Sequence, residues 1–346
     1  MDNFVLLGES IKKGEDKTIN LELPKLYHTS TNIPVRVIRG RRSGPTMFIS
    51  AAIHGDELNG IEIIRRVGKL NILKKLKGTL ILVPIVNSYG VMTLSRYTPD
   101  RRDLNRSFPG TSKGSLASRI AKAFFDEIVL KCDLGIDLHT AAIHKSNLPQ
   151  VRTNLNNVYT YNLAKVFQAP LMLHSGLRDG SLRAEAEAVG IPILLYEAGE
   201  ALRFDETSIR IGVKGIINVL REVGMIPTNT KQKTKLPIVV KSSSWIRGAE
   251  SGILRTIKAL GDTVEENEVI AYIDEPLGDG FTEILSPFDG IIIGKSQIPL
   301  IQEGDAVFHI AKFKNLETAE NKIEYFNENA IVTSEFQELN SEEIIQ

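Results

Sequence analysis

Two histidines and one glutamate in this sequence stand at spacings that suit a metal site. His54 and Glu57 belong to the segment 53–57 (IHGDE), at the turn between a predicted buried strand and a predicted helix. Ligands of α/β folds bind at the carboxyl edge of the sheet, where this turn would place an imidazole and a carboxylate. An isolated His-x-x-Glu pair is common. The alternative is a surface histidine beside an acid that favours the N-terminus of the helix.

A second strand end carries the next candidate ligand. The segment 134–140 (LGIDLHT) ends near His139, and Asp137 precedes this histidine by two residues. Alternation along a strand places both side chains on one side, so Asp137 is expected to orient the imidazole or to lie near the metal itself. Two histidines and a glutamate, with a fourth position for water, form the ligand set of a catalytic zinc site. The alternative for His139 is a hydrogen-bonded residue at a strand end.

A polar loop supplies groups that could bind a carboxylate. The segment 101–110 (RRDLNRSFPG) lies between a predicted strand and a predicted helix. Guanidinium groups bind carboxylates in a two-pronged way, and Asn105 would add a directed hydrogen bond. The alternative is a solvated polar loop without a binding role.

Glu197 ends another apolar run, in the segment 195–200 (LYEAGE), and has no basic neighbour in the sequence. A carboxylate at a strand end can act as a general base beside a metal-bound water. Glu200 competes for the same role, and either residue could instead cap the following loop.

The segment 36–225 predicts the elements that position these residues. Short apolar runs alternate with longer amphipathic segments, which is the pattern of an α/β sheet with helices on both faces. Strands are predicted at 46–53, 79–86, 133–139, 169–173 and 191–197. Helices are predicted at 58–70, 115–130, 158–167, 182–189 and 205–223.

The pattern changes after the polar, basic segment 227–235 (PTNTKQKTK), which is typical of a linker. From 237 to 313, short β-type runs broken by Gly, Asp and Pro predict a small all-β barrel or sandwich. The stretch 317–346 holds eight Glu and one Lys and is expected to be a solvated or partly disordered surface element. We therefore expect a catalytic domain at 1–230, a small β-domain at 236–315 and an acidic tail at 316–346. About 35 N-terminal residues are free to pack elsewhere.

Composition argues against several classes of protein. Lys plus Arg and Asp plus Glu both number 42, so the basic surplus that is typical of nucleic-acid binding is absent. The apolar runs are shorter than the roughly 20 residues of a membrane span. The start of the chain, MDNF, does not resemble a signal peptide, and Cys132 is the single cysteine. We expect a cytoplasmic protein with neither nucleic acid nor membrane as a partner. A homo-oligomer is compatible with the sequence.

Four motifs together resemble the succinylglutamate desuccinylase/aspartoacylase family, a branch of the zinc carboxypeptidase superfamily. They are HGDE at 54–57, DLNR followed by FPG within 103–110, DLHT at 137–140 and E-x-G at 197–199, in that order. The resemblance covers about residues 40 to 225. It implies a zinc carboxypeptidase-like mixed sheet and one zinc ion per chain, bound by His54, Glu57 and His139.

The resemblance also implies roles for the remaining candidates. Glu197 matches the catalytic glutamate, and Asn105 and Arg106 match the pair that binds the substrate carboxylate. An arginine upstream of this pair polarises the scissile carbonyl in the family. Arg96, Arg101 and Arg102 compete for that role; Arg96 is favoured and Arg102 is second. The segment 144–152 (HKSNLPQVR) resembles a loop that follows the zinc histidine in longer members and that lines the pocket.

The C-terminal segment resembles biotinyl/lipoyl-type β-domains in the rhythm of its turns. Examples are LGDTV at 260–264, SPFDG at 286–290 and EGD at 303–305. Such domains carry a cofactor on a lysine at a hairpin tip, whereas Lys295 follows the predicted hairpin. We therefore expect a structural or rim module without a swinging arm, as in long members of the family.

The resulting hypothesis is a zinc-dependent amidohydrolase that cleaves the non-peptide amide bond of a small N-acyl amino acid. Glu197 would act as the general base toward a metal-activated water. One alternative is a zinc carboxypeptidase that acts on peptide C-termini, and assays on peptides and N-acetyl amino acids would separate the two. A second is a binding protein that keeps the fold without the chemistry, for which purified protein would contain no metal.

Overall fold

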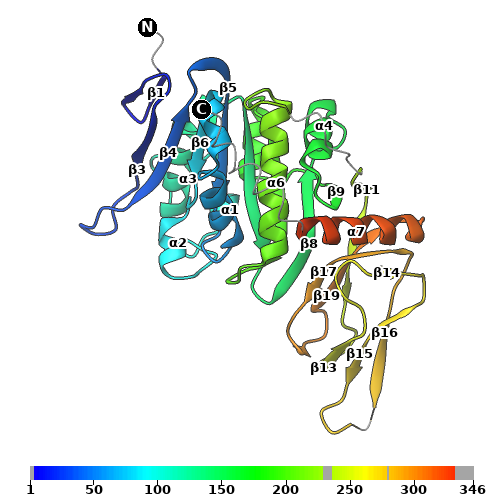
Figure 1. Ribbon diagram of the computed structural model, residues 1–346. Helices are drawn as coiled ribbons and strands as arrows, with labels where there is room; N and C mark the ends of the chain where they lie inside the picture. Colours follow the sequence, from blue (N-terminus) through cyan, green and yellow to red (C-terminus); the bar gives the residue numbers. More distant parts are fainter. Residues whose placement is uncertain (1–3, 229–235, 279, 332–346) are drawn as a thin grey trace.

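A large mixed sheet forms the centre of the molecule. The structure is a computed structural model, and it describes residues 4–228, 236–278 and 280–331. Thirteen strands of these residues join one sheet, beside a four-stranded and a two-stranded sheet. In Figure 1 the helices pack along the large sheet, and a smaller group of strands extends from it at the lower right. The expected mixed α/β fold is thereby confirmed.

Three neighbouring parallel strands position the candidate site. The strand β7 lies between β5 and β10, and β6 continues the order on the outer side of β5. Their bounds are Arg42–Ala51 for β5, Lys77–Val83 for β6, Leu134–Ala141 for β7 and Ile193–Glu200 for β10. Because the strands are parallel, their carboxyl ends meet at one edge of the sheet, which is where ligands bind in such folds.

Helices cover both faces of this part of the sheet. On one face, buried side chains of α1 (Asn59–Val67), α4 (Val158–Phe167) and α6 (Glu206–Glu222) pack on the strands. On the other face lie α3 (Leu116–Glu127) and α5 (Leu182–Ala188). Asp205 caps α6, since its side chain accepts a hydrogen bond from the Ser208 amide. Shorter helical turns are α2 (Ser88–Met92), η1 (Asn71–Lys75), η2 (Leu104–Arg106) and η3 (Val129–Lys131).

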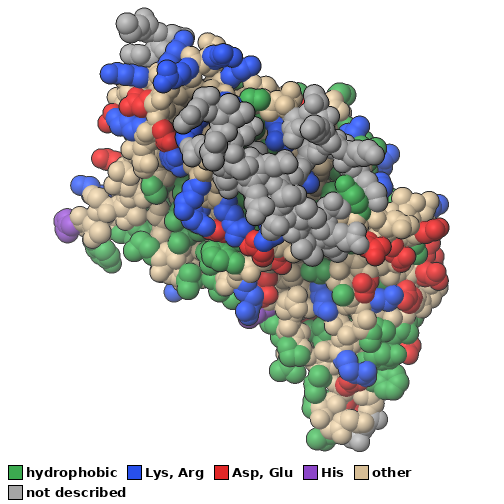
Figure 2. Space-filling model, in the orientation of Figure 1, with side chains coloured by type: hydrophobic (Ala, Val, Ile, Leu, Met, Phe, Trp, Pro, Cys, Tyr) green, Lys and Arg blue, Asp and Glu red, His purple; other side chains and the backbone are tan. Residues whose placement is uncertain are grey.

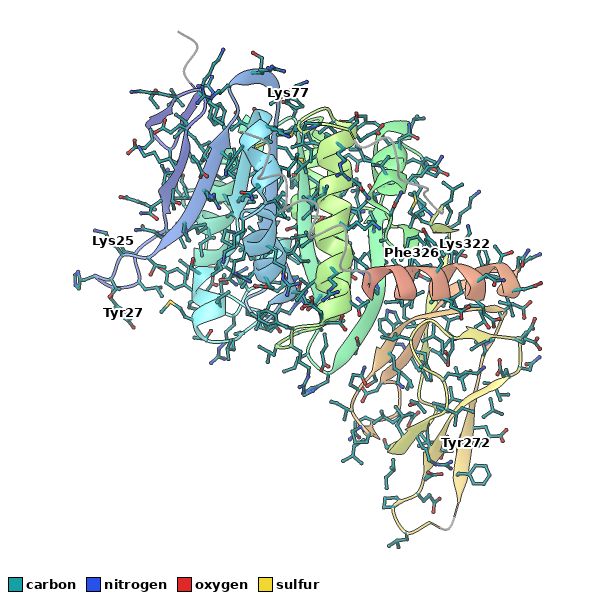
Figure 3. The ribbon with its side chains drawn as sticks, in the orientation of Figure 1. Lys25, Tyr27, Lys77, Tyr272, Lys322 and Phe326 are labelled. Carbon is teal, nitrogen blue, oxygen red and sulfur yellow. The ribbon has the colours of Figure 1, made fainter. Side chains whose placement is uncertain are left out.

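The N-terminal residues extend the same sheet. The strand β4 (Asn32–Arg39) pairs antiparallel with β6, and β3 (Asp16–Glu22) pairs with β4. A two-stranded sheet of β1 (Phe4–Leu6) and β2 (Glu9–Ile11) adds Leu6 and Ile11 to the core on the α3 face. In the loop between β3 and β4, Tyr27 is 98% exposed and projects from the body of the molecule (Figure 3).

The segment expected as a loop at 144–152 is a strand, β8 (Lys145–Thr153), so that expectation was wrong. It pairs with β10 on one side, and on the other with β9 (Leu171–His174) and β17 (Gly290–Ser296). This strand was not predicted from the sequence because its side chains do not alternate between apolar and polar. Pro149 lies where the register against β10 shifts, and much of the strand faces a polar pocket.

The C-terminal strands continue the sheet. Pairing between β17 and β8 joins β19 (Ala306–Lys312) and β12 (Ser243–Arg247) to the large sheet. Two short strands lie beside this path: β11 (Ile238–Val240) pairs with β9, and β14 (Thr263–Val264) pairs with β17. A four-stranded sheet completes the region with β13 (Gly252–Thr256), β15 (Val269–Asp274), β16 (Phe281–Leu285) and β18 (Leu300–Ile301). Of the expected linker at 227–235, residues 229–235 lie outside the described residues.

The acidic segment begins as a helix, α7 (Leu316–Ile331), rather than as the solvated or partly disordered element that its composition suggested. Ala319, Ile323 and Phe326 share one face of the helix and are buried, with Phe326 near α6 in Figure 3. Glu317, Glu320 and Glu324 of this helix are exposed, and acidic side chains gather at the right of Figure 2. Residues 332–346 lie outside the described residues. None of the helices described is long and apolar enough to span a membrane.

Candidate functional site

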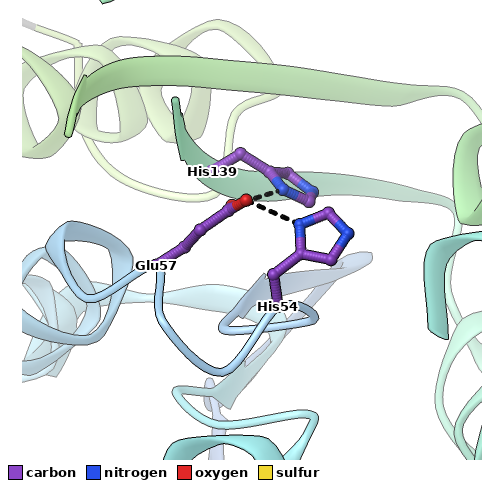
Figure 4. Close-up of side chains that lie close together, drawn as sticks. All are labelled: His54, Glu57 and His139. Atoms are coloured by element: carbon purple, nitrogen blue, oxygen red, sulfur yellow. Dashed lines mark hydrogen bonds and ion pairs between the residues drawn. The ribbon is translucent and has the colours of Figure 1, made fainter. Parts of the chain in front are cut away.

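The three candidate metal ligands meet at the carboxyl edge of the sheet. His54 follows the end of β5, Glu57 precedes α1, and His139 lies near the end of β7. Because β5 and β7 are parallel neighbours, the two histidines emerge side by side. Figure 4 shows the carboxylate of Glu57 between the two imidazoles.

Glu57 connects the two histidines through its two oxygens. Its Oε1 lies 2.6 Å from Nδ1 of His54, and its Oε2 lies 2.7 Å from Nδ1 of His139. All three side chains are buried, and one ligand atom from each lies within 4.8 Å of the others. Burial alone would raise the pKa of Glu57, but the two imidazoles overcome this and hold it well below its usual range.

A carboxylate lies within hydrogen-bond distance of the second ring nitrogen of each imidazole. Nε2 of His139 lies 2.7 Å from Asp137, which also accepts a hydrogen bond from Ser50. Nε2 of His54 lies 3.1 Å from Asp103. Asp137 therefore contacts the histidine that it was expected to orient. Asp103 was not singled out from the sequence, although it begins the DLNR motif.

This donor set fits a zinc ion. Zinc in catalytic sites takes two histidines and a glutamate as protein ligands, and a carboxylate on the far nitrogen fixes each ring. Both Nδ1 atoms face Glu57 and both Nε2 atoms face an aspartate. The arrangement assigns Nδ1 of each histidine to the metal.

Of the competing arginines, the structure brings Arg96 to the pocket and leaves Arg102 outside it. The guanidinium of Arg96 lies 3.3 Å from Glu57 and 3.0 Å from Asp103. The side chain of Arg102 is 65% exposed and its nearest carboxylate is Asp100, at 3.9 Å. Arg101 is also exposed. The side chain of Arg102 thus points to solvent, whereas carboxylates at the site hold Arg96 in place, and this geometry favours Arg96 for the role.

Asn105 and Arg106 also line the pocket. Both belong to the helical turn η2, which the Asp103 side chain caps. Oδ1 of Asn105 accepts a hydrogen bond from the amide of Leu182 at the start of α5, at 2.9 Å. The DLNR loop is therefore fixed to the helix that borders the pocket.

Glu197 lies on β10 opposite His139 of β7 and lines the same pocket. Its Oε2 accepts a hydrogen bond from Nδ2 of Asn147 at 2.9 Å and forms an ion pair with Arg152 at 3.0 Å. The competitor Glu200 accepts a hydrogen bond from the amide of His144 and pairs with Arg203. Among the residues that line the pocket, Glu200 does not appear. The structure thus separates the two acids that the sequence left open.

The lining of the pocket is also rich in cations. Lys145 and Arg152 come from β8, Arg178 precedes α5, and Arg183 lies in its first turn. Arg183 is 7% exposed; it donates to Gly176 and Ser175, and its Nη1 has no partner among the described residues. Burial lowers the pKa of this guanidinium. Lys145 and Arg152 belong to the segment 144–152, which was expected to line the pocket, although the sequence assigned no roles within it. Arg178 and Arg183 have no recognisable spacing in the sequence, so sequence reasoning missed them.

One wall of the pocket comes from the C-terminal region. Trp245 of β12 lines the pocket, and its ring stacks on His309 of β19 with centroids 4.6 Å apart. Nζ of Lys145 lies over the same ring, 5.1 Å from its centroid. A tryptophan supplies a large, rigid surface, so the C-terminal strands contribute to the lining of the pocket.

Comparison with known proteins identifies the family. Residues 43–223 match the model of the succinylglutamate desuccinylase/aspartoacylase catalytic domain, which is more than half of the chain. The chain belongs to the succinylglutamate desuccinylase/aspartoacylase family. All four motifs, from His54 to Glu197, lie inside the matched range. Succinylglutamate desuccinylases and aspartoacylases are hydrolases that act on amides.

A curated relative extends the similarity beyond the matched domain. The chain is 26% identical over 293 residues to the N-alpha-acetyl-L-2,4-diaminobutyric acid deacetylase of Halomonas elongata, which covers 81% of this chain and 85% of the relative.

Two solved structures share the fold. The succinylglutamate desuccinylase/aspartoacylase of Rhodobacter sphaeroides has a TM-score of 0.78 at 24% identity, covering 87% of this chain and 97% of the other. The ectoine utilization protein EutE (DoeB) of Ruegeria pomeroyi has a TM-score of 0.79 at 24% identity, covering 88% and 97%. These likenesses concern the fold as a whole; the resemblance of the C-terminal region to biotinyl/lipoyl-type domains stays a prediction.

Proposed function

We propose that this protein is a zinc-dependent hydrolase that cleaves the amide bond of a small N-acyl amino acid. One observation carries the proposal. A buried His-Glu-His cluster, with a carboxylate behind each imidazole, lies in one pocket with Glu197 and a set of arginines. Membership of a family of amide hydrolases supports it.

In this proposal His54, Glu57 and His139 would hold the zinc ion, with the Nδ1 side of each imidazole facing Glu57. A bound zinc ion lowers the pKa of its water to about 7 and so makes it a nucleophile near neutral pH. Asp103 and Asp137 hold the two rings in orientation, which in comparable sites is worth about 10- to 100-fold in metal affinity.

Glu197 is the general base. It accepts a proton from the attacking water at Oε1, which no described residue bonds, and then delivers that proton to the leaving amine. Its Oε2 is held by Asn147 and Arg152. In this hydrolysis the amide C–N bond breaks and a C–O bond forms between the water oxygen and the acyl carbon. The products are a carboxylate and an amine. Removal of such a group typically costs about 10²–10⁴-fold in rate.

The arginines bind the anionic parts of the reactants. Arg96 lies beside the metal ligands, where it can donate to the oxygen that becomes negative in the transition state. Asn105 and Arg106 bind the carboxylate of the amino acid in this proposal, and the buried Arg183 offers a further donor. A site so rich in cations favours acidic substrates over neutral amides.

Small substrates are favoured over peptides in this proposal, because the large side chain of Trp245 forms part of the pocket lining. The Halomonas relative is named for the deacetylation of an N-acetylated amino acid, which agrees with this choice. We also propose that residues 1–230 form the catalytic unit, with 236–315 as a rim module that lacks a swinging arm.

Elemental analysis and a substrate panel test the proposal. Purified protein should contain about one zinc per chain and should release free amine from N-acyl amino acids faster than from C-terminal residues of peptides. Protein without zinc after reconstitution would overturn the hydrolase mechanism. Faster release from peptides would favour the carboxypeptidase.

A further inference from the structure

Glu197 is held by one oxygen only. Nδ2 of Asn147 donates to its Oε2 at 2.9 Å, and Arg152 approaches the same oxygen at 3.0 Å. No described residue forms a hydrogen bond with Oε1. A carboxylate fixed at one oxygen presents the other in a defined direction, which a general base requires for proton transfer.

Asn147 lies at the point where the catalytic strands meet the C-terminal strands. In β8 it pairs with Gly199 of β10 on one side and with Gly294 of β17 on the other. A Cβ at position 294 would lie 2.9 Å from Oδ1 of Asn147, which is closer than real Cβ contacts allow. The side-chain amide of Asn147 therefore occupies the space that the absent side chain of Gly294 leaves.

The other neighbours of Gly294 are also C-terminal residues. The same Cβ would lie 3.0 Å from Cβ of His309 and 3.5 Å from Cη2 of Trp245. His309 and Trp245 stack nearly parallel, at 9° between their planes, and Ser243 holds Nε2 of His309 at 2.9 Å. The strands β12, β17 and β19 thus form a rigid surface against which the amide of Asn147 packs.

We propose that Asn147 is a positioning residue for Glu197, and that the C-terminal strands take part in the reaction by fixing the amide of Asn147. The inference rests on the proposed function of Glu197 as general base. Catalytic groups depend on neighbours that lock their orientation, since a shift of about 1 Å can cost about 100-fold in rate. The C-terminal region would then set the reaction rate as well as the size of the pocket.

Substitution of Asn147 tests the first half of the proposal. Asn147→Ala should lower kcat by about 10- to 100-fold, the usual worth of a hydrogen bond to a charged group. KM, zinc content and Tm should stay close to those of the wild type. Asn154→Ala is the matched control, because Nδ2 of Asn154 makes a 2.9 Å hydrogen bond to Glu187 outside the pocket; it should leave kcat unchanged.

Substitution of Gly294 tests the second half. Gly294→Ala should displace the amide of Asn147 and lower kcat about as much as Asn147→Ala does, although position 294 lies far from the metal ligands in sequence. Gly280→Ala is the control in the same region, since a Cβ there would meet only Glu275 at ordinary contact distance, 3.7 Å. Wild-type kcat in Gly294→Ala would overturn the role of the C-terminal strands.

A double-mutant cycle decides whether Asn147 acts through Glu197. In a Glu197→Ala background, Asn147→Ala should have no further effect on the residual rate, because residues that act as a unit are not additive. An equal loss in both backgrounds, or a change in KM and Tm alone, would overturn the positioning role while leaving the proposed function intact. A wild type and a Glu197→Ala variant that are equally inactive with zinc bound would overturn the proposed function itself.

Discussion

The two sides of the pocket satisfy their polar groups in opposite ways. On the metal side (His54, Glu57, Asp103, Asp137 and His139), every imidazole nitrogen lies close to a carboxylate oxygen. On the cation side (Lys145, Arg152, Arg178 and Arg183), buried donors such as Nη1 of Arg183 and Nε of Arg152 have no partner among the described residues.

This difference separates what the protein completes by itself from what a substrate must complete. Buried polar groups without a partner are costly, about 1–3 kcal/mol each. A metal side whose groups bind one another is preorganised, whereas a cation side with unpaired donors gains most when an anion binds. We therefore expect substitutions on the metal side to affect metal content and kcat. Those on the cation side should affect KM, except at Arg152, which also pairs with Glu197.

The largest effect is expected on the metal side, at His139. His139→Ala removes a zinc ligand, so zinc content should fall from about one per chain toward zero and activity should be lost. Elemental analysis and amine release measure both quantities. His28→Ala, in an exposed loop, should change neither. Full zinc content in His139→Ala would place the metal elsewhere.

Glu197 should show a large loss of rate without loss of metal. Glu197→Gln keeps the shape of the side chain but cannot accept the proton, so kcat should fall about 10²–10⁴-fold. Zinc content and KM should change little, because Glu197 is not among the clustered ligands. Activity near the wild-type rate in Glu197→Gln would make Glu200 the candidate general base. Glu200→Gln is therefore measured alongside it.

Asp103 gives an intermediate effect on the metal side. Asp103→Asn weakens the hold on Nε2 of His54, so zinc affinity should fall about 10- to 100-fold. Competition with a chelator, followed by elemental analysis, measures this. Asp126→Asn, which removes an exposed ion pair with Lys122 on α3, is the matched control. Unchanged zinc affinity in Asp103→Asn would show that the ring is oriented by other contacts.

The cation side should respond through KM. Arg183→Met keeps the apolar part of the side chain and removes the charged donors, so KM for an acidic N-acyl amino acid should rise about 10-fold or more. The value for kcat should change less. Arg255→Met, at an exposed pair with Asp274, controls for loss of a surface charge. A fall in kcat alone would contradict the division between the two sides.

The smallest effect is expected at Trp245. Trp245→Ala widens the pocket, so the ratio of peptide to N-acyl amino acid hydrolysis should rise, by less than about ten-fold. Tyr272→Ala, which removes an aromatic side chain far from the pocket, should leave the ratio unchanged (Figure 3). An unchanged ratio in Trp245→Ala would mean that another element excludes peptides.

Local sequence patterns gave the elements of the α/β sheet to within a few residues. The helix predicted at 58–70 is α1, Asn59–Val67, and the strand predicted at 191–197 is β10, Ile193–Glu200. Apolar periodicity is a local property, so it survives without tertiary information. Apolar periodicity did not predict β8, because the polar face of this strand lines a pocket. It also did not predict α7, because the high glutamate content of the segment suggested a solvated element despite the regular spacing of Ala319, Ile323 and Phe326.

The sequence by itself determined the close neighbours within the site. His54 and Glu57 are three residues apart at a strand-to-helix turn, and Asp137 and His139 are two apart on a strand. Backbone geometry over such distances allows few arrangements. The family resemblance rests on these same short motifs.

Only the tertiary structure decided the partners that lie far apart in the chain. Parallel pairing of β5, β7 and β10 brought the three strand ends together. Packing of the loops brought Arg96 rather than Arg102 to the pocket and brought Asp103 within hydrogen-bond distance of His54. Pairing of β8 with both β10 and β17 gave Glu197 its partners Asn147 and Arg152. These contacts depend on strand order and on side-chain packing across the whole fold, which no local spacing encodes.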